Sequence, residues 1–202
     1  MFEIGNAQSY FACLSQTVRR LPFETIDRVS DLLLDAYENS RMIYVFGNGG
    51  SAALASHFAC DLGKGTINSS KKRFRVLALT DNVPLMTAWA NDSRYEDIFA
   101  EQLTNFIRED DVAFAISGSG NSPNVLNALK FARETKATTI GLAGYSGGRM
   151  NELCDICMMV PSENMQIIED LHLCIAHALF SAVRRKLSAE DLSKSAAQGT
   201  YL

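Results

Sequence analysis

The sequence predicts an α/β fold: one parallel sheet of five strands, flanked by helices on both faces and preceded by an N-terminal helical hairpin. Two observations support this prediction. Short, apolar, β-rich runs alternate along the chain with helix-sized segments, and glycine- and serine-rich loops follow two of those runs. Parallel neighbours need a crossover, usually helical, between them, so the alternation favours a parallel sheet with helices on its faces.

Length and charge limit the organisation and the partners. The chain has 202 residues, of which 47% are hydrophobic, and fits a single domain. We expect helices over 1–40, the α/β core over 41–187 and a polar tail over 188–202. The formal net charge of -4 comes without a basic stripe, which argues against a nucleic-acid partner. Neither a signal-peptide pattern nor an apolar run near bilayer length is apparent, so we expect a cytoplasmic protein with no membrane partner.

The predicted elements follow from apolar periodicity. Helical spacing from Phe11 to Leu21 and from Ile26 to Ala36, on either side of Pro22, predicts the hairpin. The five predicted strands are Met42–Phe46, Phe74–Leu79, Val112–Ile116, Thr138–Leu142 and Ile156–Val160. The predicted helical segments after them are Ser51–Leu62, a short piece at Pro84–Trp89, Tyr95–Ile107, Pro123–Thr135, a brief turn at Gly148–Leu153 and a long helix over Gln166–Leu187.

Two loops at carboxyl ends of predicted strands are candidate ligand sites, because open parallel sheets bind ligands there. They are Gly47–Ser51 and Ser117–Ser122. Glycines allow close backbone approach, while hydroxyls and free helix N–H groups donate to phosphate oxygens. Pro123 suits the first position of the following helix. A tight polar turn is the plain alternative. Neither loop matches a nucleotide-binding pattern, so we expect no nucleotide cofactor.

The three histidines offer the chemistry. His57 and Asp61 are four residues apart on one predicted helix, a spacing that suits shared metal ligation, acid–base work or a plain surface ion pair. On the last helix, Glu169 and His177 lie about 12 Å apart along the axis. They can meet one ligand only by leaning together or by coming from different subunits. We expect His172 to be a satisfied packing histidine.

These residues fit proton transfer between adjacent carbons of a sugar. Such a reaction needs a base over the carbon and an electrophile for the developing enediolate oxygen. His177 can serve as the base. Asp61 and His57 are placed to supply an acid or a bound metal.

The five cysteines are an odd number, and most lie in apolar surroundings, which favours buried reduced thiols. Cys154 and Cys157 have the spacing of a redox motif. No second pair accompanies them and they run into an apolar stretch, so we expect no redox or metal function there.

Taken together, the motifs resemble those of bacterial phosphoheptose isomerases, which have the sugar isomerase (SIS) fold, a flavodoxin-like or Rossmann-like architecture. In chain order the motifs are Gly47-Asn-Gly-Gly-Ser51, His57-Phe-Ala, Ala90-Asn-Asp92, Ile116-Ser-Gly-Ser-Gly-Asn-Ser122 and the helix with His172 and His177. The resemblance implies an isomerase that converts sedoheptulose 7-phosphate to the aldose, and a homotetramer whose active sites lie between subunits.

The resemblance also implies roles for individual residues. Asp61 and His177 would be the acid–base pair, and zinc, one divalent ion per site, would bind His57, Asp61, Glu169 and His177. The implied substrate-binding residues are Asn48, Gly49, Ser51, Asp92, Ser117, Gly118, Ser119, Ser122 and Glu169.

Three positions depart from the family pattern. Asp61 stands where the family has glutamate, Glu169 where it has glutamine, and Gln166 where it usually has an acidic residue. The more anionic set favours divalent ions but alters the geometry of proton transfer. A non-catalytic phosphosugar-binding protein, similar to the partner of a bacterial replication initiator, is therefore the alternative. That relative lacks the full set of histidines and carboxylates. A phosphosugar-sensing transcription regulator is disfavoured, because no helix-turn-helix segment precedes the sheet.

Overall fold

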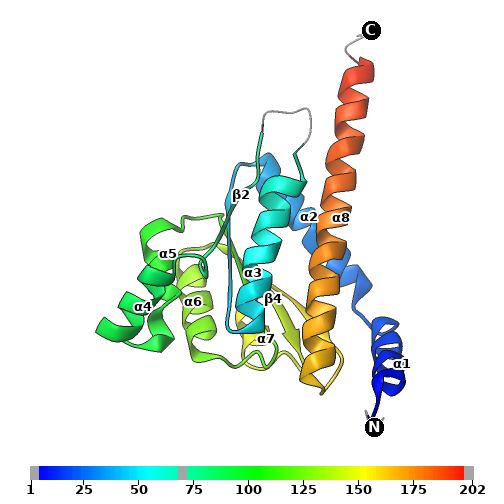
Figure 1. The fold of residues 1–202 in the computed structure, drawn as a ribbon. Helices are drawn as coiled ribbons and strands as arrows, with labels where there is room; N and C mark the ends of the chain where they lie inside the picture. The colour runs from blue at the N-terminus through cyan, green and yellow to red at the C-terminus, as the bar shows by residue number, and fades with distance from the viewer. Residues whose placement is uncertain (1–4, 68–71, 198–202) are drawn as a thin grey trace.

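The computed structural model describes residues 5–67 and 72–197 and places one sheet between two layers of helices (Figure 1). The strands are β1 (Met42–Gly47), β2 (Arg75–Ala78), β3 (Val112–Ser117), β4 (Thr138–Gly144) and β5 (Ile156–Val160). The helices are α1 (Ala7–Val18), α2 (Phe23–Glu38), α3 (Gly50–Cys60), α4 (Val83–Asp92), α5 (Ala100–Phe106), α6 (Pro123–Glu134), α7 (Met150–Leu153) and α8 (Met165–Ala197), with short turns η1 (Asp61–Gly65) and η2 (Tyr95–Asp97).

The sheet confirms the predicted five parallel strands, in the order β2-β1-β3-β4-β5. From β1 the chain crosses to β2 on one side and then returns to β3 on the other. The loops after β1 and β3 therefore leave neighbouring strand ends in opposite directions, and Gly47 pairs with Ile116 there. A crevice at such a switch point is where open parallel sheets bind ligands.

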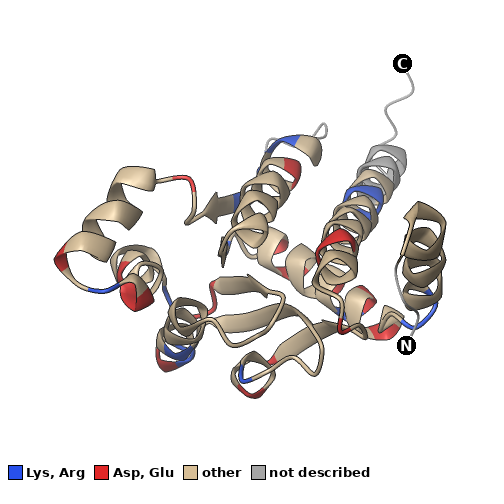
Figure 2. Ribbon diagram, turned by 60° about the horizontal axis from the view of Figure 1, so that its bottom comes forward, with Lys and Arg blue, Asp and Glu red and all other residues tan. Residues whose placement is uncertain are grey.

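Each face of the sheet carries its own core, because alternate side chains of a strand point to opposite faces. Val45, Phe114 and Leu142 pack with α2, α3 and α8 on one face. Phe46 and Ala115 pack with α5 and α6 on the other. The three central strands β1, β3 and β4 contain no charged residue, and the charges lie on the surrounding helices and loops (Figure 2). The site residues therefore stand on a rigid apolar base.

The two N-terminal helices exist as predicted, but they do not pack along each other as a hairpin. α2 lies against α8 and β5, whereas α1 makes its contacts with α8 near the end of the molecule where α8 begins (Figure 1). The Tyr10 hydroxyl donates a hydrogen bond of 2.6 Å to Asp170. The apolar face of α1 packs on α8, whereas the sequence had suggested α2. Apolar periodicity shows which face of a helix is buried but not which helix covers it.

α8 is longer and more apolar than expected. It continues past Leu187 to Ala197, because the segment expected as a polar tail is rich in helix-forming alanine, leucine, glutamate and lysine. Residues 198–202 lie outside the described residues. Met165–Ala189 is also long and apolar enough to cross a membrane by length and composition alone, contrary to our expectation. Leu171 and Leu179 on this helix are buried in the core, as in the central helix of a globular domain.

Candidate functional site

The loop Ser117–Ser122 gathers hydroxyls at the start of α6. The hydroxyl oxygens of Ser117 and Ser122 lie 3.3 Å apart, and Ser122 is the residue before the helix, with Pro123 at its first position. The Gly120 amide donates to the Ser117 hydroxyl at 3.2 Å. The free N–H groups and dipole of α6 favour an anion here, so the loop has the chemistry of a phosphate site.

The same loop is held by the segment between β4 and α7, which includes Gly147. The Met150 amide donates to the Gly120 carbonyl at 2.9 Å. A Cβ on Gly120, whose φ is +63°, would lie 1.9 Å from the Gly147 carbonyl oxygen. Only glycine fits that backbone, so the loop and the turn are packed as one unit.

Asn48, in the loop after β1, is held by two residues from other segments. It exchanges reciprocal hydrogen bonds of 2.8 Å with the Asn124 amide, and its Oδ1 also accepts the Tyr95 hydroxyl at 2.9 Å. These bonds fix the direction of the Asn48 amide. Neither Asn124 nor Tyr95 was predicted as a site residue, because each lies far from Asn48 in sequence and only the fold brings them together.

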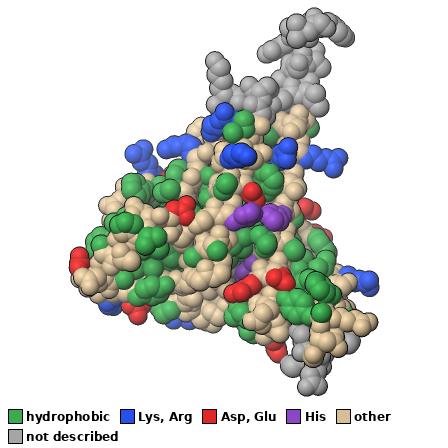
Figure 3. All heavy atoms as spheres, viewed as in Figure 1, with side chains coloured by type: hydrophobic (Ala, Val, Ile, Leu, Met, Phe, Trp, Pro, Cys, Tyr) green, Lys and Arg blue, Asp and Glu red, His purple; other side chains and the backbone are tan. Residues whose placement is uncertain are grey.

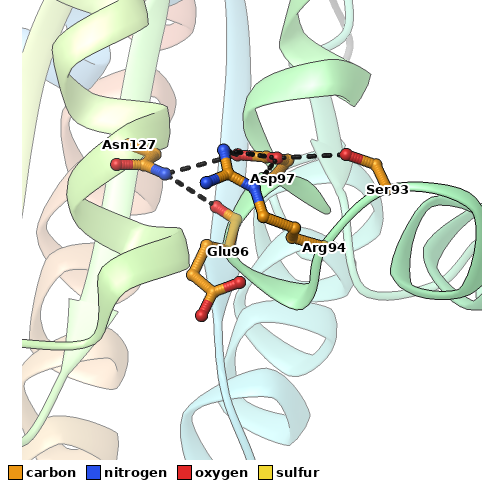
Figure 4. Close-up of polar contacts among 5 residues, drawn as sticks. All are labelled: Ser93, Arg94, Glu96, Asp97 and Asn127. Atoms are coloured by element: carbon orange, nitrogen blue, oxygen red, sulfur yellow. Dashed lines mark hydrogen bonds and ion pairs between the residues drawn. The ribbon is translucent and has the colours of Figure 1, made fainter.

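The segment that presents Tyr95 is itself pinned to α6 (Figure 4). The Arg94 guanidinium forms an ion pair of 3.0 Å with Asp97, which also accepts the Ser93 hydroxyl at 3.2 Å. Asn127 of α6 donates to the Glu96 carbonyl at 3.1 Å. η2 is therefore tied down on both sides of its single turn.

α3 and α8 run side by side because glycines remove side chains at both ends of the contact. A Cβ on Gly50 would stand 3.3 Å from Glu169 Oε1, and one on Gly65 would stand 2.7 Å from the Phe180 ring. A side chain at position 65 would clash with the Phe180 ring, whereas one at position 50 would need only a small shift of the Glu169 carboxylate. The close approach places side chains of the two helices within ligand distance of one another.

Between those glycines, three of the predicted chemical groups meet. His57 Nε2 and His177 Nε2 lie 2.9 Å apart. Asp61 Oδ2 lies 3.4 Å from His57 Nε2 and 3.8 Å from His177 Nε2. Histidine side chains gather on the surface over α3 and α8 with acidic side chains beside them (Figure 3). The i,i+4 spacing that suggested a shared role for His57 and Asp61 is therefore realised, with Asp61 at the start of the π-helical turn η1.

The three groups fit a divalent metal ion. One ligand atom from each of His57, Asp61 and His177 lies within 4.8 Å of the others. A tetrahedral zinc ion with bonds of about 2.1 Å needs ligand atoms about 3.4 Å apart. Two imidazoles and a carboxylate are also a donor set that suits zinc.

Glu169 lies apart from these three groups. It faces the start of α3 at Gly50, two turns of α8 before His177. It lines a cavity of about 380 Å³ together with Ser51, His57 and His177. Glu169 is therefore placed for ligand contact in the cavity but outside the group of three possible metal ligands.

His172 lines the same cavity and is buried, as expected of a packing histidine. Burial lowers the pKa of His172 to about 4, against a smaller opposing effect of a hydrogen bond to the Ala143 backbone. Neither ring nitrogen has a further hydrogen-bond partner of strict geometry among the described residues. The ring is therefore neutral at pH 7.

The remaining predicted site residues differ in how near they lie to the serine loop and to the cavity between α3 and α8. Gly49, with φ +54°, directly precedes α3, and Gly118 lies under the first turn of α8, where a Cβ would stand 2.5 Å from Met165 Sδ. The Ser119 hydroxyl accepts the Asn121 amide at 3.2 Å. Asp92 is exposed at the end of α4 and accepts a hydrogen bond of 2.8 Å from Asn91, away from the cavity between α3 and α8.

Comparison with known proteins agrees with this geometry. The SIS domain family model matches residues 9–144, which include both loops. The phosphoheptose isomerase of Aliarcobacter butzleri is 39% identical over 82% of this chain and 87% of its own length. The solved phosphoheptose isomerase of Neisseria gonorrhoeae superposes with a TM-score of 0.81 at 30% identity, over 87% of this chain and 95% of that one. The solved phosphoheptose isomerase of Francisella tularensis superposes with a TM-score of 0.81 at 31% identity, over 88% of this chain and 96% of that one.

Proposed function

The chain belongs to the phosphoheptose isomerases of the SIS-domain family, and on that premise we propose that its substrate is sedoheptulose 7-phosphate, converted to D-glycero-D-manno-heptopyranose 7-phosphate. The predicted five-stranded parallel sheet flanked by helices and the predicted aldose–ketose isomerase activity are confirmed by these relatives. The observation that supports the mechanism most strongly is the meeting of His57, Asp61 and His177 between α3 and α8.

We propose that the loop Ser117–Ser122 holds the phosphate end of the sugar. The hydroxyls of Ser117, Ser119 and Ser122 would donate hydrogen bonds to the phosphate oxygens, together with the free N–H groups at the N-terminus of α6. All of these groups belong to one loop and the helix that follows it. Asn48, held by three hydrogen bonds, would orient a sugar hydroxyl. Fixing the far end of the substrate lowers the entropy cost of placing its reacting carbons.

The proposed chemistry is a proton transfer without net oxidation. His177 removes a proton from the carbon beside the ketone, and the electron pair moves through the carbon–carbon bond to the carbonyl oxygen, which gives an enediolate. Return of that proton to the former carbonyl carbon, and transfer of a second proton from the neighbouring hydroxyl to the former carbonyl oxygen, leaves the aldose. Asp61, 3.8 Å from His177, stabilises the imidazolium that forms and can exchange the second proton.

As the alternative to a free His177 base, His57, Asp61 and His177 would together hold a zinc ion, which would polarise the oxygens of the developing enediolate. The substitution of aspartate for the family's glutamate at position 61 does not prevent this geometry, because the shorter carboxylate still lies 3.4 Å from His57. Glu169 would contact the substrate at the mouth of the cavity, where it adds negative charge. The full set of groups favours catalysis over the non-catalytic alternative.

We also propose a cytoplasmic homotetramer with sites between subunits. No residue of α4 is fully buried, and Phe11 and Leu173 are 65% and 40% exposed. Apolar surface beside a cavity is typical of an interface, and a second subunit would supply the enclosure that one subunit lacks. Light scattering of the purified protein checks the assembly. A monomer that turns over substrate would contradict the intersubunit site.

The test of function uses the purified chain with sedoheptulose 7-phosphate, after chelation and again after zinc is restored. The aldose is followed by NMR, and bound metal is measured by elemental analysis. A nitrogen lone pair that binds an ion cannot also accept a proton. Turnover without metal would therefore assign His177 to the role of base. Turnover that depends on zinc would assign His57, Asp61 and His177 to the role of metal ligands. No aldose in either state, despite binding of the sugar phosphate, would contradict the proposal.

A further inference from the structure

Two cysteines outside the site share one space at the edge of the sheet. Cys154 follows α7 and Cys157 lies in β5, next to Gly141 of β4. The sulfur atoms of both cysteines lie 2.9 Å from the point where a Cβ on Gly141 would stand. The missing side chain of this glycine gives both thiols room in the same place, which reopens the redox role that the sequence disfavoured.

The two thiols are also chemically paired. A hydrogen bond between them raises the pKa of Cys154 and lowers the pKa of Cys157, with burial opposing the second effect. Both side chains are half-buried and free, so a small oxidant can reach them. A thiol with a lowered pKa beside a second thiol is the arrangement of an attacking and a resolving cysteine.

The segment that carries Cys154 is connected to the serine loop through one helical turn. The Cys154 amide donates to the Met150 carbonyl at 3.0 Å, and the Met150 amide donates to the Gly120 carbonyl at 2.9 Å. The neighbouring Arg149 amide donates to Asn121 Oδ1 at 3.1 Å. A shift of Cys154 therefore acts on α7 and, through two backbone amides, on the loop.

We propose that Cys154 and Cys157 form a reversible disulfide on exposure to hydrogen peroxide, and that this disulfide weakens binding of a sugar phosphate by the serine loop. The second half rests on the phosphate role proposed above. Cys157 is held by the ladder of β5, whereas Cys154 lies in the extended residue that ends α7. Disulfide geometry restricts both Cβ atoms, so Cys154 is the residue that moves.

The oxidation balances with peroxide as the only oxidant. The Cys157 thiolate attacks one peroxide oxygen, the O–O bond breaks, and the released hydroxide takes a proton to become water, which leaves a sulfenic acid. The Cys154 sulfur then attacks the Cys157 sulfur, the S–O bond breaks, and its hydroxide leaves as water with the proton of Cys154. Two thiols lose two electrons and the peroxide is reduced to two waters.

The first measurement maps the disulfide in the full chain. Trypsin releases Met150–Arg184, which contains Cys154, Cys157 and Cys174. After peroxide and alkylation without reductant, we expect one alkyl group on this peptide, on Cys174, and three after dithiothreitol. The Cys174→Ser variant, the matched control, should still close the disulfide, whereas Cys154→Ser should not. Three alkyl groups after peroxide would overturn the site.

The second measurement is calorimetric binding of sedoheptulose 7-phosphate to reduced and oxidised protein. We expect the dissociation constant to rise about tenfold on oxidation and to return with dithiothreitol, because one weakened hydrogen bond to a charged phosphate has this effect. Cys154→Ser should bind equally with and without peroxide. An unchanged constant in the disulfide form would overturn the coupling. Reduced protein that fails to bind would contradict the phosphate role, and with it the coupling, while the disulfide map would still stand.

Discussion

The two ends of the site are built differently. The serine loop is one stretch of chain at the end of β3, whereas His57 and His177 come from helices whose histidines are 120 residues apart in sequence. A local loop keeps its hydroxyls together whenever β3 and α6 form. The histidine pair exists only while α3 and α8 stay in contact along Gly50 and Gly65. The phosphate end is therefore the more robust feature, and the reacting end depends more on packing.

Replacing His177 should have the largest effect. In His177→Gln the base is lost, and we expect kcat to fall about a hundredfold to ten-thousandfold, the usual contribution of a general base. Binding of the sugar phosphate should be retained, because the serine loop is untouched. Steady-state kinetics and calorimetry measure the two effects. Ser181→Ala, exposed one turn further along α8, is the control and should behave as the unaltered protein. Equal loss of binding and turnover would contradict the separation of the two ends.

Replacing Ser117 should act at the other end. Its hydroxyl lies beside that of Ser122 and accepts the Gly120 amide. Loss of one hydrogen bond to a charged phosphate should raise KM about tenfold to a hundredfold in Ser117→Ala. kcat should change less. Steady-state rates of the alanine variant over a range of substrate concentrations check this expectation, and a fall in kcat at unchanged KM would show that the loop does not hold the substrate.

The pH dependence of stability should report on the burial of His172 beside the cavity between α3 and α8. Its pKa in the folded protein, about 4, is below the ordinary value of 6.5, so the unfolded chain binds the proton more readily between these pH values. Stability from this residue is thus full above pH 6.5 and is lost as pH falls towards 4, by up to about 3 kcal/mol. Urea unfolding across that range measures the slope. His172→Gln, which cannot titrate, should show a shallower slope, and an unchanged slope would assign the pH dependence elsewhere.

Tyr95 should have the smallest effect. Tyr95→Phe removes one hydrogen bond to Asn48 while Asn124 still holds that amide. A single neutral hydrogen bond contributes about 1 kcal/mol, so we expect KM to rise about fivefold. The comparison with Asn48→Ala, which removes the amide itself, separates orientation from contact. A larger effect of the tyrosine than of the asparagine would contradict the positioning role.

Local signals predicted one end of the site better than the other. Glycines and serines after an apolar run identify the loop Ser117–Ser122, and the i,i+4 spacing identifies His57 with Asp61, because both lie within single elements. The approach of His177 to His57 depends on how α3 packs on α8, which no pattern within either helix specifies. Tyr95 escaped prediction for the same reason, since its partner is a residue of another loop.

Element boundaries and partners show the same limit. All five strands were found, because apolar β-rich runs in a buried sheet are strong local signals. The end of α8 and the partner of α1 were not. Helix-forming residues past Leu187 extend α8 without an apolar stripe, and the apolar face of α1 fits α8 as well as α2 by periodicity alone.

The division between anchor and chemistry is tested most directly by calorimetric titration of sedoheptulose 7-phosphate into His177→Gln and Ser117→Ala, measured side by side with the unaltered protein. We expect the histidine variant to bind as the unaltered protein does and to produce no detectable aldose, and the serine variant to bind about tenfold more weakly while it still turns over at saturation. Tight binding by the serine variant together with weak binding by the histidine variant would contradict the assignment of the phosphate to the loop.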